Sequence, residues 1–402
     1  MEDPLLECHY AGHKGQVTSV SFNPNLTQVA SGGLDGAVMV WNRKQSMRAF
    51  RLVGHKDGVQ SVQFSPSGRL VASGSRDCTV RLWVPSVKGE STVFKAHTGT
   101  VRCVRFSQDG SFLATSSDDK SIKIFSTYRQ KFRLSLKGHT NWVRSVSPSP
   151  DGRLVASGSD DKTVKIWDLA SKTCAQTFFE PDGMITSVAF HPDGTCVAAG
   201  CSDSTVKIWD IRTNKLLQHY QVHDDAVNDI SFHASGDFLL TASTDSTLKI
   251  LDLREGHLFY TLHGHQDAAT AAAFSPDGSM FASGGADNKV LVWQTRFDKY
   301  LSELLLDEPH DPASLRPAPM ANPREDTRHA PSRGAATPQP PTAALQPTDL
   351  PYSLTSTLEH IVSQLDVLTQ TVSILEERLT YVEESMTARD PVPAGTKRPM
   401  RP

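Results

Sequence analysis

A period of about 42 residues runs through the first three quarters of the chain, and it restricts the fold more than any other feature. Steps of this length from one aspartate reach an aspartate every time, without insertion or deletion, at Asp35, Asp77, Asp119, Asp161, Asp203, Asp245 and Asp287. The same step reaches histidine at six of seven positions and tryptophan at five of seven. The sequence therefore predicts seven equivalent units that bury their apolar faces against one another.

Each unit reads as a series of short strands, because apolar and polar residues alternate over brief runs with turn residues between them. The unit from Gly138 to Asp168 opens with Gly-His and ends with Trp-Asp, and this pattern resembles the WD40 repeat. The resemblance implies one four-stranded blade per repeat. We expect an all-β chain over residues 1–297, folded as a seven-bladed WD40 β-propeller.

The ends of this region predict how the ring closes. The last repeat reaches Trp293 without a good fourth strand, whereas the segment 5–10 has strand character but no blade of its own. We expect this N-terminal strand to complete the seventh blade and remove an exposed sheet edge. Deletion of residues 1–11 should then destabilise the whole domain.

The repeated polar residues resemble a catalytic constellation, represented in the fourth repeat by His139, Ser157, Asp161 and Trp167. A hydrolase needs one such site, whereas this set recurs along the chain. We interpret it as a structural hydrogen-bond network within each blade. The fifth repeat has Pro181 and Ala199 in place of histidine and serine, so its network should be absent. No enzyme activity, cofactor or metal site is predicted.

Trp142 stands at a position where the period does not require tryptophan, just before a predicted first strand. With Arg102, Arg144 and Met184 on neighbouring repeats, it predicts a protein-binding cluster of the aromatic and arginine type that is common at interface hot spots. The alternative is a tryptophan that lies over its own blade.

The composition changes after the last repeat. Eleven prolines and no aromatic residue fall between Pro309 and Pro351, which predicts a disordered linker over 298–352. A heptad seam then predicts a coiled coil over 353–389, followed by a disordered tail over 390–402. The seam residues are Leu358, Ile361, Leu365, Leu368, Val372, Leu375, Leu379 and Val382. The helix could instead pack on the propeller, and the sequence leaves open whether a coiled coil would be a dimer or a trimer.

Charge and cysteine content limit the environment. The net charge of −3 gives no general attraction to nucleic acid or to an anionic membrane. The six cysteines show no paired or metal-ligand spacing, which is typical of a reducing compartment. We therefore expect a cytoplasmic protein that binds neither nucleic acid nor membrane.

Propeller, proline-rich linker and C-terminal coiled coil together resemble the proteome-of-centriole family of centriolar WD-repeat proteins. The segments that carry this resemblance are residues 65–98 and 354–379. It implies a non-enzymatic scaffold of centrioles, the centrosome and the basal bodies of cilia, acting in centriole assembly and integrity and in cilium formation. The implied partners are centriolar wall proteins or tubulin in microtubules, together with further copies of the chain through the coiled coil.

A second interpretation rests on a shorter motif. The segment Trp209-Asp210-Ile211-Arg212 is similar to the Trp-Asp-x-Arg sequence by which some WD-repeat proteins dock onto the adaptor of cullin ubiquitin ligases. It would make the chain a substrate receptor of such a ligase. An Asp-x-Arg sequence after the tryptophan of a blade is also a common way for a strand to end.

Overall fold

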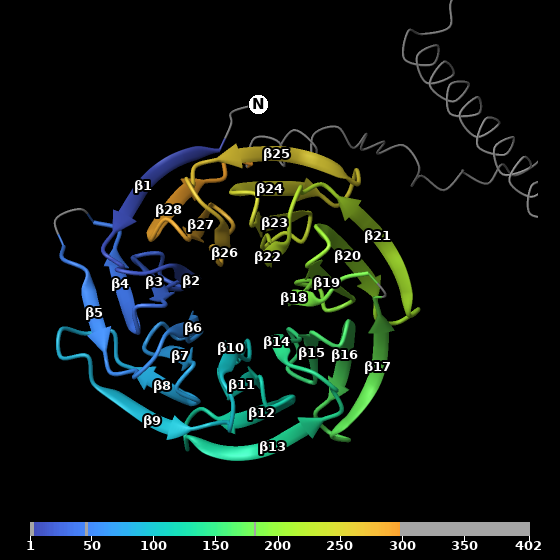
Figure 1. Ribbon diagram of the computed structural model, residues 1–402, viewed down its shortest axis with the longest axis horizontal. Helices are drawn as coiled ribbons and strands as arrows, with labels where there is room; N and C mark the ends of the chain where they lie inside the picture. The colour runs from blue at the N-terminus through green and yellow to red at the C-terminus, as the bar shows by residue number, and fades with distance from the viewer. Residues whose placement is uncertain (1–3, 45–46, 181, 298–402) are drawn as a thin grey trace, which may run out of the picture. The chain divides into compact units, whose positions relative to one another are not determined.

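The computed structural model describes residues 4–44, 47–180 and 182–297, and these residues form seven antiparallel sheets of four strands each. The sheets stand as blades around a central axis (Figure 1). The prediction of an all-β, seven-bladed propeller is confirmed. The expected linker, coiled coil and tail lie outside the described residues. No helix in the described part of the chain is long and apolar enough to cross a membrane.

Four strands follow one another in each blade, from the central axis outward. The first three blades consist of β2 (Val17–Phe22), β3 (Gln28–Gly33), β4 (Ala37–Asn42) and β5 (Phe50–Val53); β6 (Val59–Phe64), β7 (Val71–Ser75), β8 (Thr79–Trp83) and β9 (Ser91–Lys95); and β10 (Val101–Phe106), β11 (Phe112–Ser117), β12 (Ser121–Ser126) and β13 (Lys131–Lys137).

The remaining four blades follow the same scheme, except that the outermost strand of the seventh comes from the N-terminus. They consist of β14 (Val143–Pro148), β15 (Leu154–Ser159), β16 (Thr163–Asp168) and β17 (Thr173–Phe179); β18 (Ile185–Phe190), β19 (Cys196–Cys201), β20 (Thr205–Asp210) and β21 (Lys215–Gln221); β22 (Val227–Phe232), β23 (Phe238–Ser243), β24 (Thr247–Asp252) and β25 (His257–His263); and β26 (Ala269–Phe274), β27 (Met280–Gly285), β28 (Lys289–Gln294) and β1 (Leu5–Ala11).

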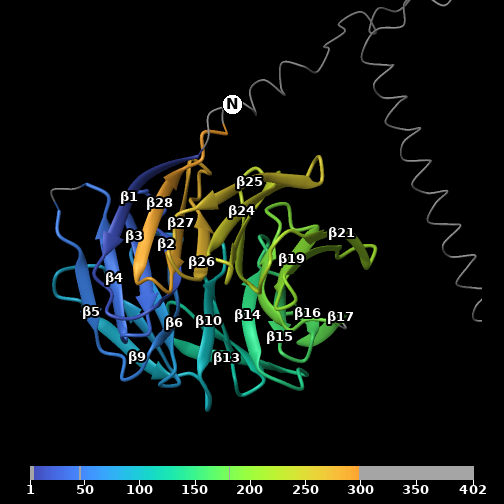
Figure 2. The same ribbon diagram turned by 45° about the horizontal axis from the view of Figure 1, so that its top comes forward.

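The ring closes through antiparallel pairing of β1 with β28, which joins the two ends of the repeat region in one sheet. The register runs from Leu5 opposite Gln294 to Ala11 opposite Lys289, with one irregularity between Leu6 and Cys8. The two strands lie side by side in both views (Figures 1 and 2). The first segment of the repeat region thereby covers the edge that the last repeat leaves open.

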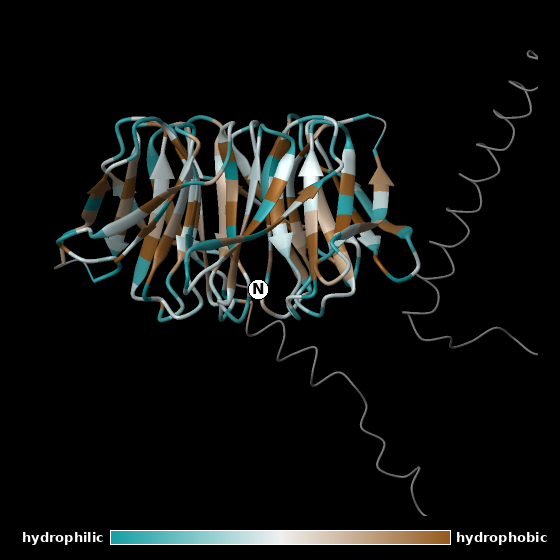
Figure 3. Ribbon diagram, turned by 90° about the horizontal axis from the view of Figure 1, so that it is seen from below, coloured by the Kyte–Doolittle hydropathy of each residue, from teal (hydrophilic) through white to brown (hydrophobic). Residues whose placement is uncertain are grey.

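The apolar core lies between blades. Strands β3 and β11 are buried along almost their whole length, because a neighbouring blade packs against each of their two faces. In β11, for example, Phe112 packs toward the fourth blade and Leu113 packs toward the second. The side view shows apolar colour along the strands and hydrophilic colour in many of the turns at the two faces (Figure 3). Each blade therefore depends on its neighbours for burial, as expected of a repeat that cannot fold alone.

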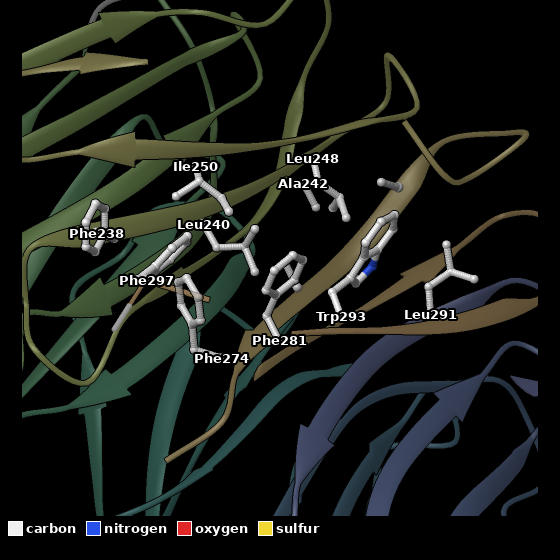
Figure 4. Packing of buried hydrophobic residues seen from close by; sticks show 12 residues of the cluster. Phe238, Leu240, Ala242, Leu248, Ile250, Phe274, Phe281, Leu291, Trp293 and Phe297 are labelled. Atoms are coloured by element: carbon white, nitrogen blue, oxygen red, sulfur yellow. The ribbon is translucent and has the colours of Figure 1, made fainter. Parts of the chain in front are cut away.

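The last described residues are anchored beneath the sixth and seventh blades. Phe297 is 2% exposed and lies against Phe238, with ring centroids 4.7 Å apart. It packs among the side chains of the largest apolar cluster, which also holds Phe274, Phe281 and Trp293 (Figure 4). The hydroxyl of Thr295 donates to the carbonyl of Gly278 at 2.8 Å. These contacts fix the chain at the end of the propeller domain.

A β-bulge occurs near the start of the innermost strand of every blade. The pairing register shifts between the first and third residues of each of these strands. A bulge leaves one residue unpaired and redirects its side chain. The residues at the bulge are Thr18, Gln60, Arg102, Arg144, Thr186, Asn228 and Thr270, and all of them line one central cavity.

Candidate protein-binding site

The repeated His, Ser, Asp and Trp form a hydrogen-bonded chain inside the fourth blade. The indole Nε1–H of Trp167 donates to Ser157 Oγ at 2.8 Å, and Ser157 lies 2.7 Å from His139 Nε2. His139 Nδ1 lies 2.8 Å from Asp161 Oδ2. This geometry fits a neutral histidine that donates from Nδ1 and accepts the serine proton at Nε2. Equivalent histidine and aspartate contacts recur at 2.8–3.1 Å in five other blades.

The aspartate of this chain holds a tight turn in place. Asp161 accepts hydrogen bonds from the amides of Thr140 and Thr163 and from the hydroxyl of Thr163. Burial raises the pKa of Asp161, but the hydrogen bonds from His139, Thr163 and Thr140 outweigh burial and keep the pKa well below its usual range. The next residue, Lys162, has a positive φ of 64°. The set therefore joins two loops to a strand, which is a structural task.

The fifth blade has a buried ion pair near the position where the other blades have the histidine. Lys207 Nζ lies 2.5 Å from Glu180 Oε2, and both side chains are almost fully buried. Ala199 offers no hydroxyl to Trp209, and Pro181 lies outside the described residues. Carboxylate oxygens of Glu180, Asp182 and Asp203 lie within 4.8 Å of one another, but the ammonium group of Lys207 already supplies a cation at this point.

The bulge positions around the channel have a shared structural role in four of the seven blades. Their threonine or asparagine side chain donates to a backbone carbonyl at the start of the next blade's innermost strand. The four donors are Thr18, Thr186, Asn228 and Thr270. Each of these bonds joins two blades and uses a short side chain that remains at the channel wall.

Blades two to four depart from this arrangement. Their bulge residues are Gln60, Arg102 and Arg144, with longer side chains. Arg102 forms a two-point ion pair with Asp118, through Nε at 2.7 Å and Nη2 at 3.0 Å. Arg144 pairs in the same way with Asp160, at 2.7 and 2.8 Å. Since each arginine is held at two points within its own blade, its planar head has a fixed orientation.

Trp142 lies against both of these guanidinium groups. The Cζ atoms of Arg102 and Arg144 are each 5.5 Å from the centroid of its ring. The tryptophan therefore contacts the neighbouring third blade as well as its own, yet it remains 42% exposed. The hydrogen bonds to Asp160 raise the pKa of Arg144 further above its ordinary value, so this cation keeps its charge. We name Trp142, Arg102, Arg144, Asp118 and Asp160 the Trp142 platform.

Met184 extends the apolar surface of this face onto the fifth blade. It precedes β18, as Trp142 precedes β14, and it is 41% exposed. Its amide donates to Ser202 Oγ at 2.9 Å, which fixes the loop. The sequence did not reveal that Asp118 and Asp160 neutralise the two arginines. The available signal was the equal spacing of 16 residues between each arginine and its aspartate.

The chemistry of the Trp142 platform suits protein recognition. A large exposed ring is held by two cations whose charges are neutralised by carboxylates, so the surface is aromatic, rigid and close to electrically neutral. Exposed tryptophans beside arginine are enriched at the energetic centres of interfaces. A fixed side chain also loses little conformational entropy when a partner binds. The seam residues of the expected coiled coil, Leu358 to Val382, lie outside the described residues.

The Trp-Asp-x-Arg segment of the fifth blade has a local role in the structure. Asp210 Oδ1 accepts the amides of Arg212 and Thr213 at 2.7 and 3.2 Å, which stabilises the turn that follows β20. Asp252 makes the same contacts after β24 with the amides of Arg254 and Glu255. The repetition of this turn supports its interpretation as a strand exit.

Comparisons with known proteins agree with the propeller. The chain matches a family model described as the Nucleolar protein 10-like N-terminal domain over residues 98–294, and the WD domain, G-beta repeat model over residues 5–42 and 46–84. It is 56% identical over 50 residues to POC1 centriolar protein homolog A of Xenopus tropicalis, an alignment that covers 12% of this chain and 11% of that protein.

Two further relatives give alignments of similar extent. The chain is 57% identical over 50 residues to POC1 centriolar protein homolog A of Bos taurus, covering 12% of each protein. It is 49% identical over 51 residues to POC1 centriolar protein homolog B of Danio rerio, covering 13% of this chain and 10% of that one. The chain thus spans about a tenth of the length of the curated relatives it matches.

Proposed function

Because the chain carries WD40 repeats and is homologous to POC1 centriolar proteins over about 50 residues, we propose that it is a non-enzymatic scaffold of centrioles and basal bodies. Its localisation on this proposal is the cytoskeleton of the cytoplasm, at the centriole, the centrosome and the base of the cilium. It contributes there to centriole assembly and integrity and to cilium formation. The relatives' printed name supports the location, and the propeller fold supports a role in protein binding.

The observation that carries the binding role is the exposed ring of Trp142 between two fixed arginines. Three of the seven bulge positions lack the short side chains that form hydrogen bonds between blades elsewhere. Two of these three positions, Arg102 and Arg144, belong to the Trp142 platform. We propose that a centriolar wall protein or tubulin docks there. The C-terminal seam pairs copies of the chain, so that two propellers bind one array of partners with a raised effective concentration.

Localisation of the tagged full-length chain tests the proposal in cycling and ciliated cells. The wild-type chain should mark paired centrioles and the cilium base, and a 1–300 truncation should do so more weakly. Trp142→Ala should reduce the centriolar signal, because truncation of a central aromatic anchor costs at least about 2 kcal/mol of binding free energy. Tyr128→Ala is the matched control, since this aromatic residue is exposed on the strand connection between β12 and β13. Equal signals for both variants would contradict a role for Trp142.

A charged residue in the seam tests self-association separately. Leu368→Lys should convert the full-length chain to a monomer in analytical ultracentrifugation and weaken its retention at centrioles, because a buried lysine opposes seam packing. Ser363→Lys lies outside the seam and should change neither property. A Leu368→Lys chain that remains oligomeric would exclude the coiled coil as the pairing element. Co-purification with a cullin ligase that is lost in Arg212→Ala would instead favour the substrate-receptor function.

A further inference from the structure

The innermost strands of neighbouring blades are joined by a second set of hydrogen bonds, deeper in the channel than the bulges. In four blades the fifth residue of the innermost strand offers a side-chain oxygen to the amide of the last residue of the next such strand. Ser21 accepts from Phe64 at 3.1 Å, and Ser147 accepts from Phe190 at 3.3 Å. This position therefore normally carries a hydrogen-bond acceptor.

Arg105 occupies this position in the third blade, and its guanidinium cannot accept a hydrogen bond. The residue that faces it in the next blade is Pro148, which has no amide to donate. The two departures compensate each other, because no backbone donor is left without an acceptor at this junction. Arg105 is thus released from the task that four of its six equivalents perform, and its charge is unnecessary for joining the blades.

The guanidinium of Arg105 has no hydrogen bond or ion pair to any other residue within 4–44, 47–180 and 182–297. It lines the central cavity of about 310 Å³ together with Gln60, Arg102 and Arg144. Gln60 accepts from Arg102 Nη1 through Oε1 at 3.3 Å, while its Nε2 is buried without a partner. Arg105 therefore reaches the cavity as a group that can only donate, without a protein acceptor, whereas the Gln60 Nε2 atom is enclosed by its surroundings.

The carboxylate of Asp229 on the opposite side of the cavity does not fill this need. It already accepts hydrogen bonds from the Ser187 hydroxyl and from the amides of Ile230 and Ala272, at 2.9–3.1 Å. Burial raises the pKa of Asp229, and the positive charge of Arg105 lowers it only through longer-range attraction. Arg102 and Arg144 are also paired, with Asp118 and Asp160. Arg105 remains the cation of this cavity that lacks a direct carboxylate partner.

We infer that the central cavity receives the carboxylate of a glutamate or aspartate side chain from the partner segment that docks on the Trp142 platform. This inference rests on the proposed function. A carboxylate supplies the acceptors that Arg105 lacks, and it fits a cavity of side-chain size. The single unpaired cation and the opposing Asp229 disfavour a doubly charged phosphate. The aromatic surface at the rim and the donors within the channel then recognise one peptide at two points.

A random peptide library displayed on phage and selected against the full-length chain tests the inference. The enriched peptides should share an acidic residue at one position, and their Kd can be measured by fluorescence polarisation. Arg105→Gln should weaken binding at least about tenfold, because a hydrogen bond to a charged group is lost. Changing the shared glutamate of the peptide to glutamine should have the same effect. The two losses should not add when variant and changed peptide are combined.

Controls separate the channel from the rest of the surface. Arg69→Gln removes an equal charge from an exposed turn after β6 and should leave the Kd unchanged, while Arg105→Lys should restore part of the affinity. Thermal unfolding should show that Arg105→Gln folds as stably as the wild-type chain.

Four results would decide against all or part of this reasoning. The inference is wrong if the wild-type chain enriches no acidic position, or if Arg105→Gln binds the enriched peptides as well as the wild type. If inorganic phosphate displaces the enriched peptides while the change from glutamate to glutamine leaves the Kd of the peptide unaltered, the cavity is a site for small anions instead. Loss of binding in Arg105→Gln but not in Trp142→Ala would retain the channel site and contradict the platform.

Discussion

The buried network of the fourth blade makes a quantitative prediction about stability. Ser157 is fully buried, and its hydroxyl contacts both His139 Nε2 and Trp167 Nε1 at 2.7 and 2.8 Å. Ser157→Ala removes one oxygen and leaves two buried polar groups without partners. Each such group costs about 1–3 kcal/mol, so the free energy of unfolding should fall by roughly 2–6 kcal/mol.

A double-mutant cycle separates the polar contribution from simple loss of packing. Trp167→Phe removes the indole donor, and the third blade already has Phe125 at this position beside Thr115 and His97. In the double variant no indole N–H remains to be left unsatisfied. The losses of unfolding free energy in the two single variants should therefore add up to about 1–3 kcal/mol more than the loss measured in the double variant.

Equilibrium urea unfolding of the full-length chain, followed by far-ultraviolet circular dichroism, measures these differences without relying on tryptophan fluorescence. Ser171→Ala lies in an exposed turn of the same blade and should change the free energy of unfolding by no more than about 0.5 kcal/mol. A loss below this value for Ser157→Ala, or simple additivity in the cycle, would refute the view that the network satisfies buried groups.

Three further predictions concern acid, the chain end and the bulge. Burial lowers the pKa of four histidines from 6.5; these are His13, His55, His223 and His265. As the pH falls, these histidines are therefore protonated in the unfolded chain before they are protonated in the folded one. The free energy of unfolding, measured as a function of pH, should start to fall below pH 6.5. A second loss should appear between about pH 4 and 2, since hydrogen bonds outweigh burial and lower the pKa of Asp77 to about 2. Phe297→Ala should cost about 3–5 kcal/mol in urea unfolding, because the ring is buried among aromatic neighbours, whereas Phe132→Ala on an exposed strand should cost much less. The pair Arg144→Thr and Asp160→Ser copies Thr186 and Ser202 of the fifth blade, and it should abolish platform binding while it changes the urea unfolding free energy by about 1 kcal/mol or less.

The period of the sequence was sufficient to predict the propeller, because seven equivalent aspartates in strict register admit few other folds. Burial patterns and turns then follow from the same repeat. The substitution of Pro181 and Ala199 predicted that the fifth blade lacks the network, but it did not predict the buried pair of Lys207 and Glu180. That pair depends on which way a lysine side chain turns within the blade, and one-dimensional spacing does not specify this direction.

The candidate site was predicted only in part for a similar reason. Trp142 stands out as a departure from the repeat, and both arginines are on neighbouring blades. The bulge that directs Arg102 and Arg144 toward the ring is a property of backbone pairing. Both arginines line the central cavity, and their ion pairs with Asp118 and Asp160 fix the orientation of their heads beside the ring. The coiled-coil seam stays a prediction.

Residues that differ from the repeat indicate function when the structure shows how the lost contact is replaced. At Pro148 the loss of an amide is matched by the loss of an acceptor at Arg105, so stability does not require either residue at this junction. At the bulges of blades two to four, short donors that join blades are replaced by Gln60, Arg102 and Arg144. Both changes fall on one side of the same channel. The short donors join blades elsewhere in the ring, so their replacement on blades two to four supports the proposed ligand that contacts the rim and the channel together.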